Sequence, residues 1–244
     1  MQITLRSSDR SWRVFLLVLI LTVVLAPLSV PTFAQDDQPD TATVQTALDA
    51  ANQAYLDDEF LTAHSLWRPL AEAGNAEAQT NLGILARYGL GVVQDYAVAL
   101  HWYELAAAQG YARGLYQLGL MHEYGLGVGQ SDAEALRWYR ASAAQEYVRA
   151  QFALGVMFAE GRGVVADTVE AAHWYRRAAE QGDANAQNII GLRYASGDGV
   201  TQDVVAALRW YALAAQQGHG DAQENLRMAC AEQGGSQIMS VECR

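Results

Sequence analysis

Residues 101–103 read His101-Trp102-Tyr103, and similar tripeptides recur as Arg137-Trp138-Tyr139, His173-Trp174-Tyr175 and Arg209-Trp210-Tyr211. Each step is 36 residues long (138 − 102, 174 − 138 and 210 − 174). A fixed period of roughly 20–50 residues is typical of proteins that stack one small structural unit many times. The sequence therefore predicts a repeat array in which each unit packs mainly on its neighbours.

Two further motifs keep the same period and outline the unit. A Leu-Gly or Ile-Gly pair lies at residues 82–83, 118–119, 154–155 and 190–191, and a Gly-x-Gly-Val motif follows at 89–92, 125–128, 161–164 and 197–200. Glycine readily adopts the left-handed conformation that closes a helix, so the second motif predicts the end of a first helix and a sharp turn. A second helix is then predicted after the N-cap residues Asp95, Ser131, Asp167 and Asp203.

The motifs predict four helix pairs, with atypical units at both ends of the array. The pairs span residues 75–110, 111–146, 147–182 and 183–218. Residues 43–74 have helical spacing of apolar residues without the glycine motif, and residues 219–244 contain one more helix and a tail. Since terminal repeats are usually atypical, both segments are predicted to be caps. Glu146 replaces the closing glycine of the second pair, which predicts a strained turn.

Gly83 and its equivalents lie inside the first helices, where glycine costs about 1 kcal/mol relative to alanine. A cost repeated in every unit predicts close approach of the second helix. Trp102 has helical spacing with Ala99 and Ala106, which predicts a buried tryptophan and a partly exposed Tyr103.

The N-terminal segment resembles a secretory signal. Three arginines precede the apolar run Val14–Ala26, and Thr32-Phe33-Ala34 fits a cleavage site. The run is shorter than the roughly 20 residues of a membrane-spanning helix, so residues 1–34 are predicted to be cleaved rather than to remain as an anchor. The mature protein is then expected in the periplasm or outside the cell, with residues 35–42 as a disordered lead-in and no stable membrane anchor.

The composition excludes one class of partner and suggests one covalent link. The net charge is −11, with 16 basic residues, all Arg, against 27 acidic ones, which argues against nucleic acid as a partner. The two cysteines, Cys230 and Cys243, lie near the C-terminus. In an oxidising compartment they predict a disulfide, although two free thiols in the tail fit the sequence as well.

The repeated residues resemble a known family. The pattern Ala184-x-Ala186-Gln187-x-x-Ile190-Gly191, continued by Gly197-x-Gly199-Val200 and Trp210-Tyr211, is similar to the Sel1-like repeat, and residues 43–72 look like one tetratricopeptide unit. The resemblance implies an all-α, right-handed solenoid of antiparallel helix pairs that acts as an adaptor scaffold. Some cysteine-rich members link positions eight residues apart by disulfides. Here such positions hold Ala107/Leu115, Ala143/Gln151 and Ala179/Gln187, so that link is absent.

The sequence offers little support for catalysis, cofactors or metals. A chain without Lys cannot supply the Ser-x-x-Lys motif of serine β-lactamases, and the His-Glu-x-x-His and Gly-x-Ser-x-Gly motifs are also absent. The Gly-x-Gly motifs lack the strand and the Lys of a phosphate-binding loop. Asp57 and Asp58 are read as an acidic turn. A cell-envelope enzyme, or a direct binder of peptidoglycan or polysaccharide, remains as the alternative.

A binding surface for a protein or peptide is predicted on the first helices. In tetratricopeptide arrays the first helices line the concave face, and the resemblance implies the same here. Counting from the Leu-Gly pairs selects Tyr88, Arg113, Tyr116, Leu120, Tyr124, Arg149, Phe152 and Val156. The alternative is that half of these side chains are buried between repeats. On the first interpretation Tyr116 and Phe152 lie outside the core, whereas Trp138 lies in it.

Overall fold

The structure is a computed structural model that describes residues 41–233, and every regular element within this range is a helix. The predicted signal peptide, residues 35–40 of the predicted lead-in and Cys243 lie outside the described residues, whereas residues 41 and 42, predicted to be disordered, belong to the first helix. The eleven helices are α1 (Thr41–Leu56), α2 (Phe60–Glu72), α3 (Ala76–Tyr88), α4 (Tyr96–Ala108), α5 (Ala112–Tyr124), α6 (Asp132–Ala143), α7 (Val148–Glu160), α8 (Thr168–Glu180), α9 (Ala184–Ser196), α10 (Val204–Gln216) and α11 (Gly220–Gln233).

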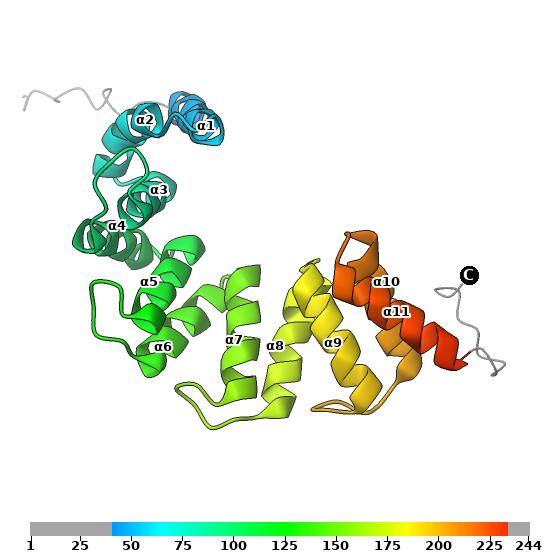
Figure 1. The fold of residues 1–244 in the computed structure, drawn as a ribbon. Coiled ribbons are helices and arrows are strands. Elements are labelled where there is room, and N and C mark those ends of the chain that lie inside the picture. The colour runs from blue at the N-terminus through cyan, green and yellow to red at the C-terminus, as the bar shows by residue number, and fades with distance from the viewer. Residues whose placement is uncertain (1–40, 234–244) are drawn as a thin grey trace, which may run out of the picture. The chain divides into compact units, whose positions relative to one another are not determined.

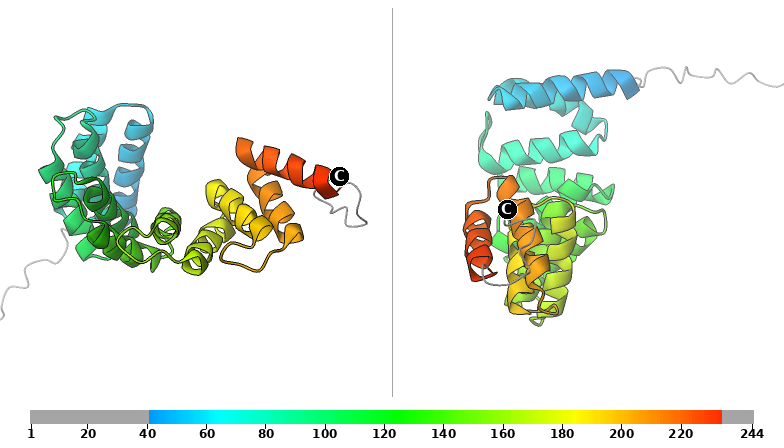
Figure 2. Two further views of the ribbon diagram at one scale, coloured as in Figure 1. Left: turned by 60° about the horizontal axis from the view of Figure 1, so that its bottom comes forward. Right: turned by 90° about the vertical axis from the view of Figure 1, so that its right-hand side faces the viewer.

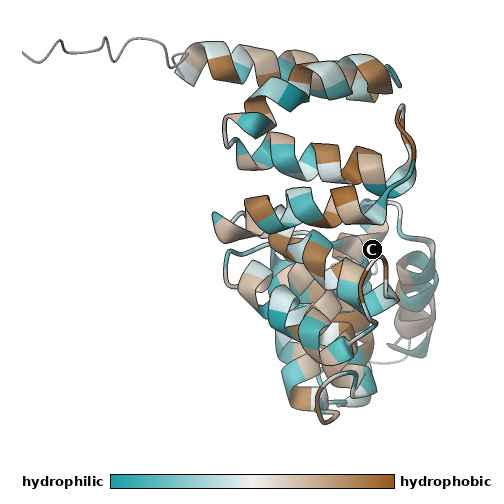
Figure 3. Ribbon diagram, turned by 90° about the vertical axis from the view of Figure 1, so that its left-hand side faces the viewer, coloured by the Kyte–Doolittle hydropathy of each residue, from teal (hydrophilic) through white to brown (hydrophobic). Residues whose placement is uncertain are grey.

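The helices form consecutive antiparallel pairs. Helices α1 and α2 pack together, as do α3 and α4, α5 and α6, α7 and α8, and α9 and α10, and each pair also packs on the next. Figures 1 and 2 show the pairs following one another in chain order, with α11 lying on α10. Along the helices, hydrophobic and hydrophilic residues alternate at short intervals (Figure 3). The prediction of an all-α solenoid of helix pairs is confirmed.

The glycine motif ends each first helix in the predicted way. Gly89, Gly125, Gly161 and Gly197 have φ values of 68°, 66°, 71° and 80°, in the left-handed region. The amide of Gly89 donates to the carbonyl of Leu85 and so satisfies one terminal carbonyl of α3. In the four repeats that carry the glycine motif, the second helix then begins after a residue whose side chain caps it. For example, the Asp167 carboxylate accepts hydrogen bonds from the amides of Val169 and Glu170, at 2.9 and 3.1 Å.

The core is built on a contact between the internal glycine of each first helix and a tyrosine of the second helix. A Cβ added to Gly83 would lie 2.5 Å from Tyr103 Cε1, and one added to Gly155 would lie 2.7 Å from the Tyr175 ring. The predicted close approach is therefore observed. The prediction of a buried tryptophan and a partly exposed tyrosine is wrong: Tyr103 and Tyr139 are fully buried, whereas Trp102 and Trp138 are only half-buried.

Glutamine side chains join neighbouring helices, and one of these bonds links Ala179 and Gln187, two positions at which the resemblance implies a disulfide in some cysteine-rich relatives. The Gln187 amide donates to the carbonyl of Ala179, eight residues earlier, at 3.1 Å, and Gln217 donates to Gln187 at 2.8 Å. Gln109 and Gln181 make the same bond to Gln79 and Gln151. These bonds satisfy amide groups that would be costly to bury alone, so they favour one register between neighbouring helices.

A charged network connects the second and third repeats. The Glu123 carboxylate, at the end of α5, is almost fully buried and accepts a hydrogen bond from the Tyr139 hydroxyl. Arg162, in the loop after α7, forms an ion pair with Glu123 at 2.6 Å and contacts Asp132 at 3.3 Å. Burial and the neighbouring Glu123 carboxylate raise the pKa of Tyr139 far above its ordinary value, so the hydroxyl stays protonated and donates.

Candidate binding surface on the first helices

All of the predicted binding residues except Tyr88, which ends α3, form one stripe along each of two first helices. In α5 the stripe consists of Arg113, Tyr116, Leu120 and Tyr124, separated by three, four and four residues. In α7 Arg149, Phe152 and Val156 have the corresponding positions. Side chains three or four residues apart lie on the same face of a helix, so each set lies on one face. We call the two sets together the first-helix stripe.

The ends of α3 and α5 carry the most exposed aromatic residues of this surface. Tyr88 and Tyr124 are the last residues of their helices, and they are 57% and 59% exposed. Helices α3 and α5 contact each other directly although α4 lies between them in the chain. Two tyrosines are thus displayed at equivalent positions of adjacent repeats.

Tyr116 and Phe152 lie deeper than the sequence suggested. Both are half-buried, and their ring centroids lie 5.5 Å from Tyr139 and 5.6 Å from Tyr175. Burial raises the pKa of Tyr116 to about 12, against the opposing effect of the Arg149 charge. The expectation that these two rings lie outside the core is wrong, because each packs on a core tyrosine.

The remaining members of the stripe differ in exposure. Leu120 and Val156 are half-buried against the same hydrophobic core as Phe152, whereas Arg149 is exposed. Arg113 is half-buried, and its Nη1 donates to Asn81 Oδ1 at 2.9 Å. Arg149 is therefore the more accessible of the two guanidinium groups.

Arg113 also lines a small pocket where three successive first helices meet. The pocket has a volume of about 200 Å³ and is lined by residues of α1, α2, α3 and α5, among them Asn52, Tyr55 and Trp67. Asn81 donates to Asn52 at 3.4 Å, and Asn52 donates to Glu77 at 3.0 Å. A polar chain thus crosses from α1 through α3 to α5.

Comparison with known proteins identifies the repeats. A family model described as the Sel1 repeat matches residues 76–111, 112–147, 148–183 and 184–219, which is more than half of the chain. The chain belongs to the Sel1 repeat family. Sel1 arrays generally act as scaffolds for protein–protein interaction.

Two solved structures extend this family relationship. A Sel1 repeat protein from Oxalobacter formigenes is 35% identical, with a TM-score of 0.69 over 76% of this chain and 74% of that one. A protective antigen of uropathogenic Escherichia coli strains, which displays an SLR fold, is 28% identical, with a TM-score of 0.73 over 83% of this chain and 44% of that one. No functionally curated protein matches the chain.

The Sel1 array shows no metal-ligating group of three or more side chains between residues 41 and 233. In the same range, none of its helices has the length and apolar character needed to cross a membrane. Cys230 lies half-buried in α11. Because its predicted partner Cys243 is outside the described residues, the disulfide stays a prediction.

Sequence reasoning missed Asn52 and Asn81, which bring Arg113 into the pocket. Asn52 and Asn81 are 29 residues apart, and Asn81 and Arg113 are 32 apart. Neither of these separations along the chain equals the repeat period of 36 residues, and no local sequence pattern distinguishes either asparagine. Only the stacking of α1, α3 and α5 brings the three side chains together, so the sequence contained no usable signal for them.

Proposed function

We propose that this protein is a non-catalytic scaffold that binds a protein or peptide on its first helices. The observation that carries the proposal is the pair Tyr88 and Tyr124, exposed on adjacent helices α3 and α5. Aromatic side chains are enriched at protein interfaces because they bury a large area with little loss of conformational freedom. Membership of the Sel1 family supports the same class of function.

The first-helix stripe also supports this proposal through its charge. Arg149 is exposed at the start of α7, where its charge acts on the half-buried Tyr116 of α5, whereas Tyr124 is the last residue of α5. A guanidinium beside aromatic rings suits a partner that brings an acidic side chain together with apolar ones. We expect such a partner to meet the ends of α3 and α5 with its apolar residues and Arg149 with its carboxylate.

The proposed site of action is the periplasm or the cell exterior. It rests on the signal-like segment at residues 1–34 and on the pair of cysteines. Cell fractionation with mass spectrometry of the N-terminus tests this part separately. A mature chain that begins at Gln35 in the periplasmic fraction or the medium is expected. An intact N-terminus in the cytoplasmic fraction would contradict it.

The binding test compares two pairs of exposed side chains. A partner is first captured from periplasmic extract and identified, and its affinity is then measured by calorimetry. The Tyr88→Ala/Tyr124→Ala variant should weaken binding by about 2 kcal/mol or more, because interface aromatics are frequent hot spots. The control variant Val93→Ala/Val165→Ala removes apolar groups that are 90% and 86% exposed in loops and should bind normally. Unchanged affinity of the tyrosine variant would place the partner elsewhere.

A further inference from the structure

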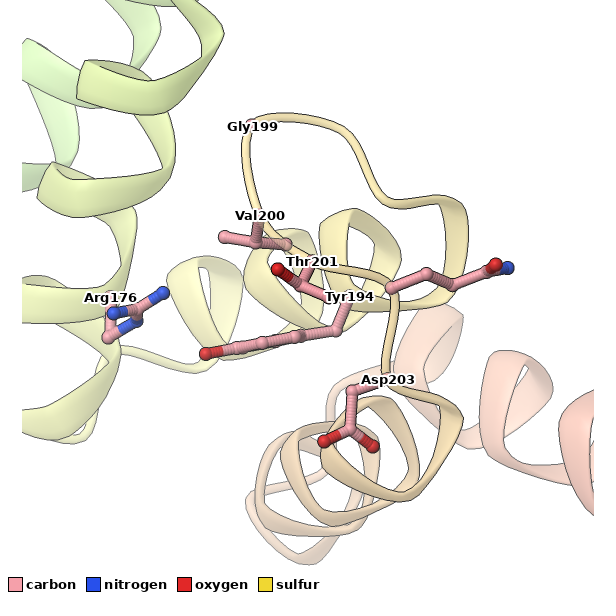
Figure 4. A pocket seen from close by; sticks show the side chains of 7 residues that line it. Arg176, Tyr194, Gly199, Val200, Thr201 and Asp203 are labelled. Carbon is pink, nitrogen blue, oxygen red and sulfur yellow. The ribbon is translucent and has the colours of Figure 1, made fainter.

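A second site lies apart from the first-helix stripe, at the junction of the third and fourth repeats. A pocket of about 470 Å³ is formed by α8, the end of α9 and the loop at 197–203 (Figure 4). Its lining includes Arg176 from α8, Tyr194 from α9, and Val200 and Thr201 from the loop. Figure 4 shows the Arg176 guanidinium, the Tyr194 hydroxyl and the Thr201 hydroxyl on facing sides of this pocket.

Arg176 has no carboxylate partner within ion-pair distance among residues 41–233. Its guanidinium carbon lies 5.5 Å from the centroid of the Tyr194 ring. Its Nε is buried and has no hydrogen-bond partner in the described part of the chain. The contact with the aromatic ring holds the half-buried guanidinium in place, and a buried Nε–H group without an acceptor is energetically unfavourable.

The other polar side chains of the pocket are occupied. The Asp203 carboxylate accepts a hydrogen bond from the Ala206 amide at 2.9 Å and so caps α10. The Gln202 amide donates to the carbonyl of Ala195 at 2.8 Å. No hydrogen bond or ion pair joins either side chain to Arg176 in the described part of the chain, which leaves the guanidinium and the two hydroxyls as the groups that can donate to a ligand.

The preceding junction of the array has the arginine and the aromatic ring but neither hydroxyl. There Arg140 lies over the Phe158 ring at 5.6 Å, in the same arrangement 36 residues earlier. Phe158 stands where Tyr194 stands in the next repeat, and Val165 stands where Thr201 stands. The same arginine–ring pair thus occurs without either hydroxyl, which provides a control inside the molecule.

We propose that the pocket of Arg176, Tyr194 and Thr201 binds a carboxylate group. A guanidinium donates two parallel hydrogen bonds to the two oxygens of a carboxylate, and the hydroxyls can donate to the same oxygens. Val200 supplies an apolar wall for the carbon atoms next to that group. One guanidinium in a pocket that also contains the Asp203 carboxylate, in a chain of net charge −11, favours a single negative charge over the double charge of phosphate.

The proposal is tested by nitrogen-15 nuclear magnetic resonance of the purified protein. Sodium acetate is added at constant ionic strength, with sodium chloride as the reference salt. The Arg176 Nε–H and Thr201 amide signals should shift and saturate with acetate, while the Arg140 Nε–H signal should not. Equal shifts at Arg140 and Arg176, or shifts that never saturate, would show that acetate associates with arginine in general and would overturn the proposal.

Matched substitutions identify the groups responsible. Arg176→Gln should weaken acetate binding by about tenfold or more, and Tyr194→Phe and Thr201→Val by about threefold each, as expected for charged and neutral hydrogen bonds. Arg140→Gln should leave the affinity unchanged. If Arg176→Gln does not fold, Tyr194→Phe and Thr201→Val still test the proposal. These two variants should fold, because Phe158 and Val165 occupy the equivalent positions of the preceding junction. Unchanged affinity in both would overturn the assignment.

Two further probes define the ligand. Inorganic phosphate should need higher concentrations than acetate to shift the same signals, and the reverse order would overturn the choice of carboxylate. Two short acetylated peptides then distinguish the possible sources of the carboxylate. One has a free C-terminal carboxylate, and the other has the same sequence with a C-terminal amide. Tighter binding of the free peptide than of acetate points to a peptide terminus, and equal binding points to a small organic acid.

Discussion

At the scale of single residues, the internal glycine of each first helix and the tyrosine that covers it determine how closely a pair can pack. The glycine was predictable, because a cost repeated in every unit implies a close approach. The choice between Trp102 and Tyr103 was not. Trp102 lies three residues after Ala99 and four before Ala106, and Tyr103 lies four after Ala99 and three before Ala106. Helical spacing therefore fits both aromatic residues equally well. Only the structure shows that the smaller ring faces Gly83.

The Gly155→Ala variant tests this contact. An added Cβ would lie 2.7 Å from two ring carbons of the fully packed Tyr175. Overpacking of a core typically costs about 1–3 kcal/mol, whereas alanine gains about 1 kcal/mol over glycine in a helix, so we expect a net loss of stability. Urea unfolding measures it. Gly220→Ala in α11 is the control, since no described atom lies within 4 Å of its added Cβ. Equal stability of both variants would contradict the proposed role of the contact.

At the scale of elements, the turn between α6 and α7 departs from the other turns of its kind. Glu146 has a φ of 58° in a position where Gly110 and Gly182 have φ values of 74° and 96°. The predicted strain is thus present. The Glu146 carboxylate also accepts hydrogen bonds from Arg177 and, at 2.9 Å, from Gln151. Contacts of the side chain therefore oppose the strain of the backbone.

Glu146→Gly should separate these two effects. In an Arg177→Gln/Gln151→Met background both side-chain contacts of Glu146 are already lost, and relief of the left-handed conformation should raise the free energy of unfolding by about 1 kcal/mol. In the unmodified protein the gain should be smaller, because an exposed ion pair contributes up to about 1 kcal/mol. Gly182→Ala is the converse control: its added Cβ meets nothing within 4 Å, so any loss reports the backbone alone. A loss of stability for Glu146→Gly in both backgrounds would contradict the expected strain.

Among the helices, the positions of the helix ends could be predicted from the sequence, whereas the burial of the first-helix stripe could not. Helix ends follow local chemistry, and Asp95, Ser131, Asp167 and Asp203 each accept a hydrogen bond from the first turn of a helix as predicted. The depth of the first-helix stripe does not follow from local chemistry. Tyr116 and Phe152 pack on Tyr139 and Tyr175 of the second helices, and residue spacing within one helix does not encode such contacts between helices.

At the scale of the whole molecule, one buried tyrosine in each repeat makes the free energy of unfolding of the array depend on pH. Burial raises the pKa of Tyr103, Tyr139, Tyr175 and Tyr211, for Tyr175 to about 12. In the unfolded chain a tyrosine releases its proton near pH 10. Between these two values the unfolded state binds fewer protons than the folded state, so the free energy of unfolding falls as pH rises. This contribution to stability is fully present below about pH 10 and is lost toward pH 12.

Alkaline titration should therefore unfold the array as its core tyrosines ionise. The buried tyrosines should ionise last, and tyrosinate absorbance reports their ionisation. We expect the helical circular dichroism signal to fall in the pH range of this last rise in absorbance. Tyr175→Phe keeps the ring that packs on Gly155 and removes the ionisable hydroxyl, so its unfolding should move to higher pH. Tyr88→Phe changes an exposed residue and should unfold at the same pH as the unmodified protein. An unchanged midpoint for Tyr175→Phe, or helical signal that persists after all tyrosines have ionised, would show that the buried hydroxyls do not limit stability in alkali.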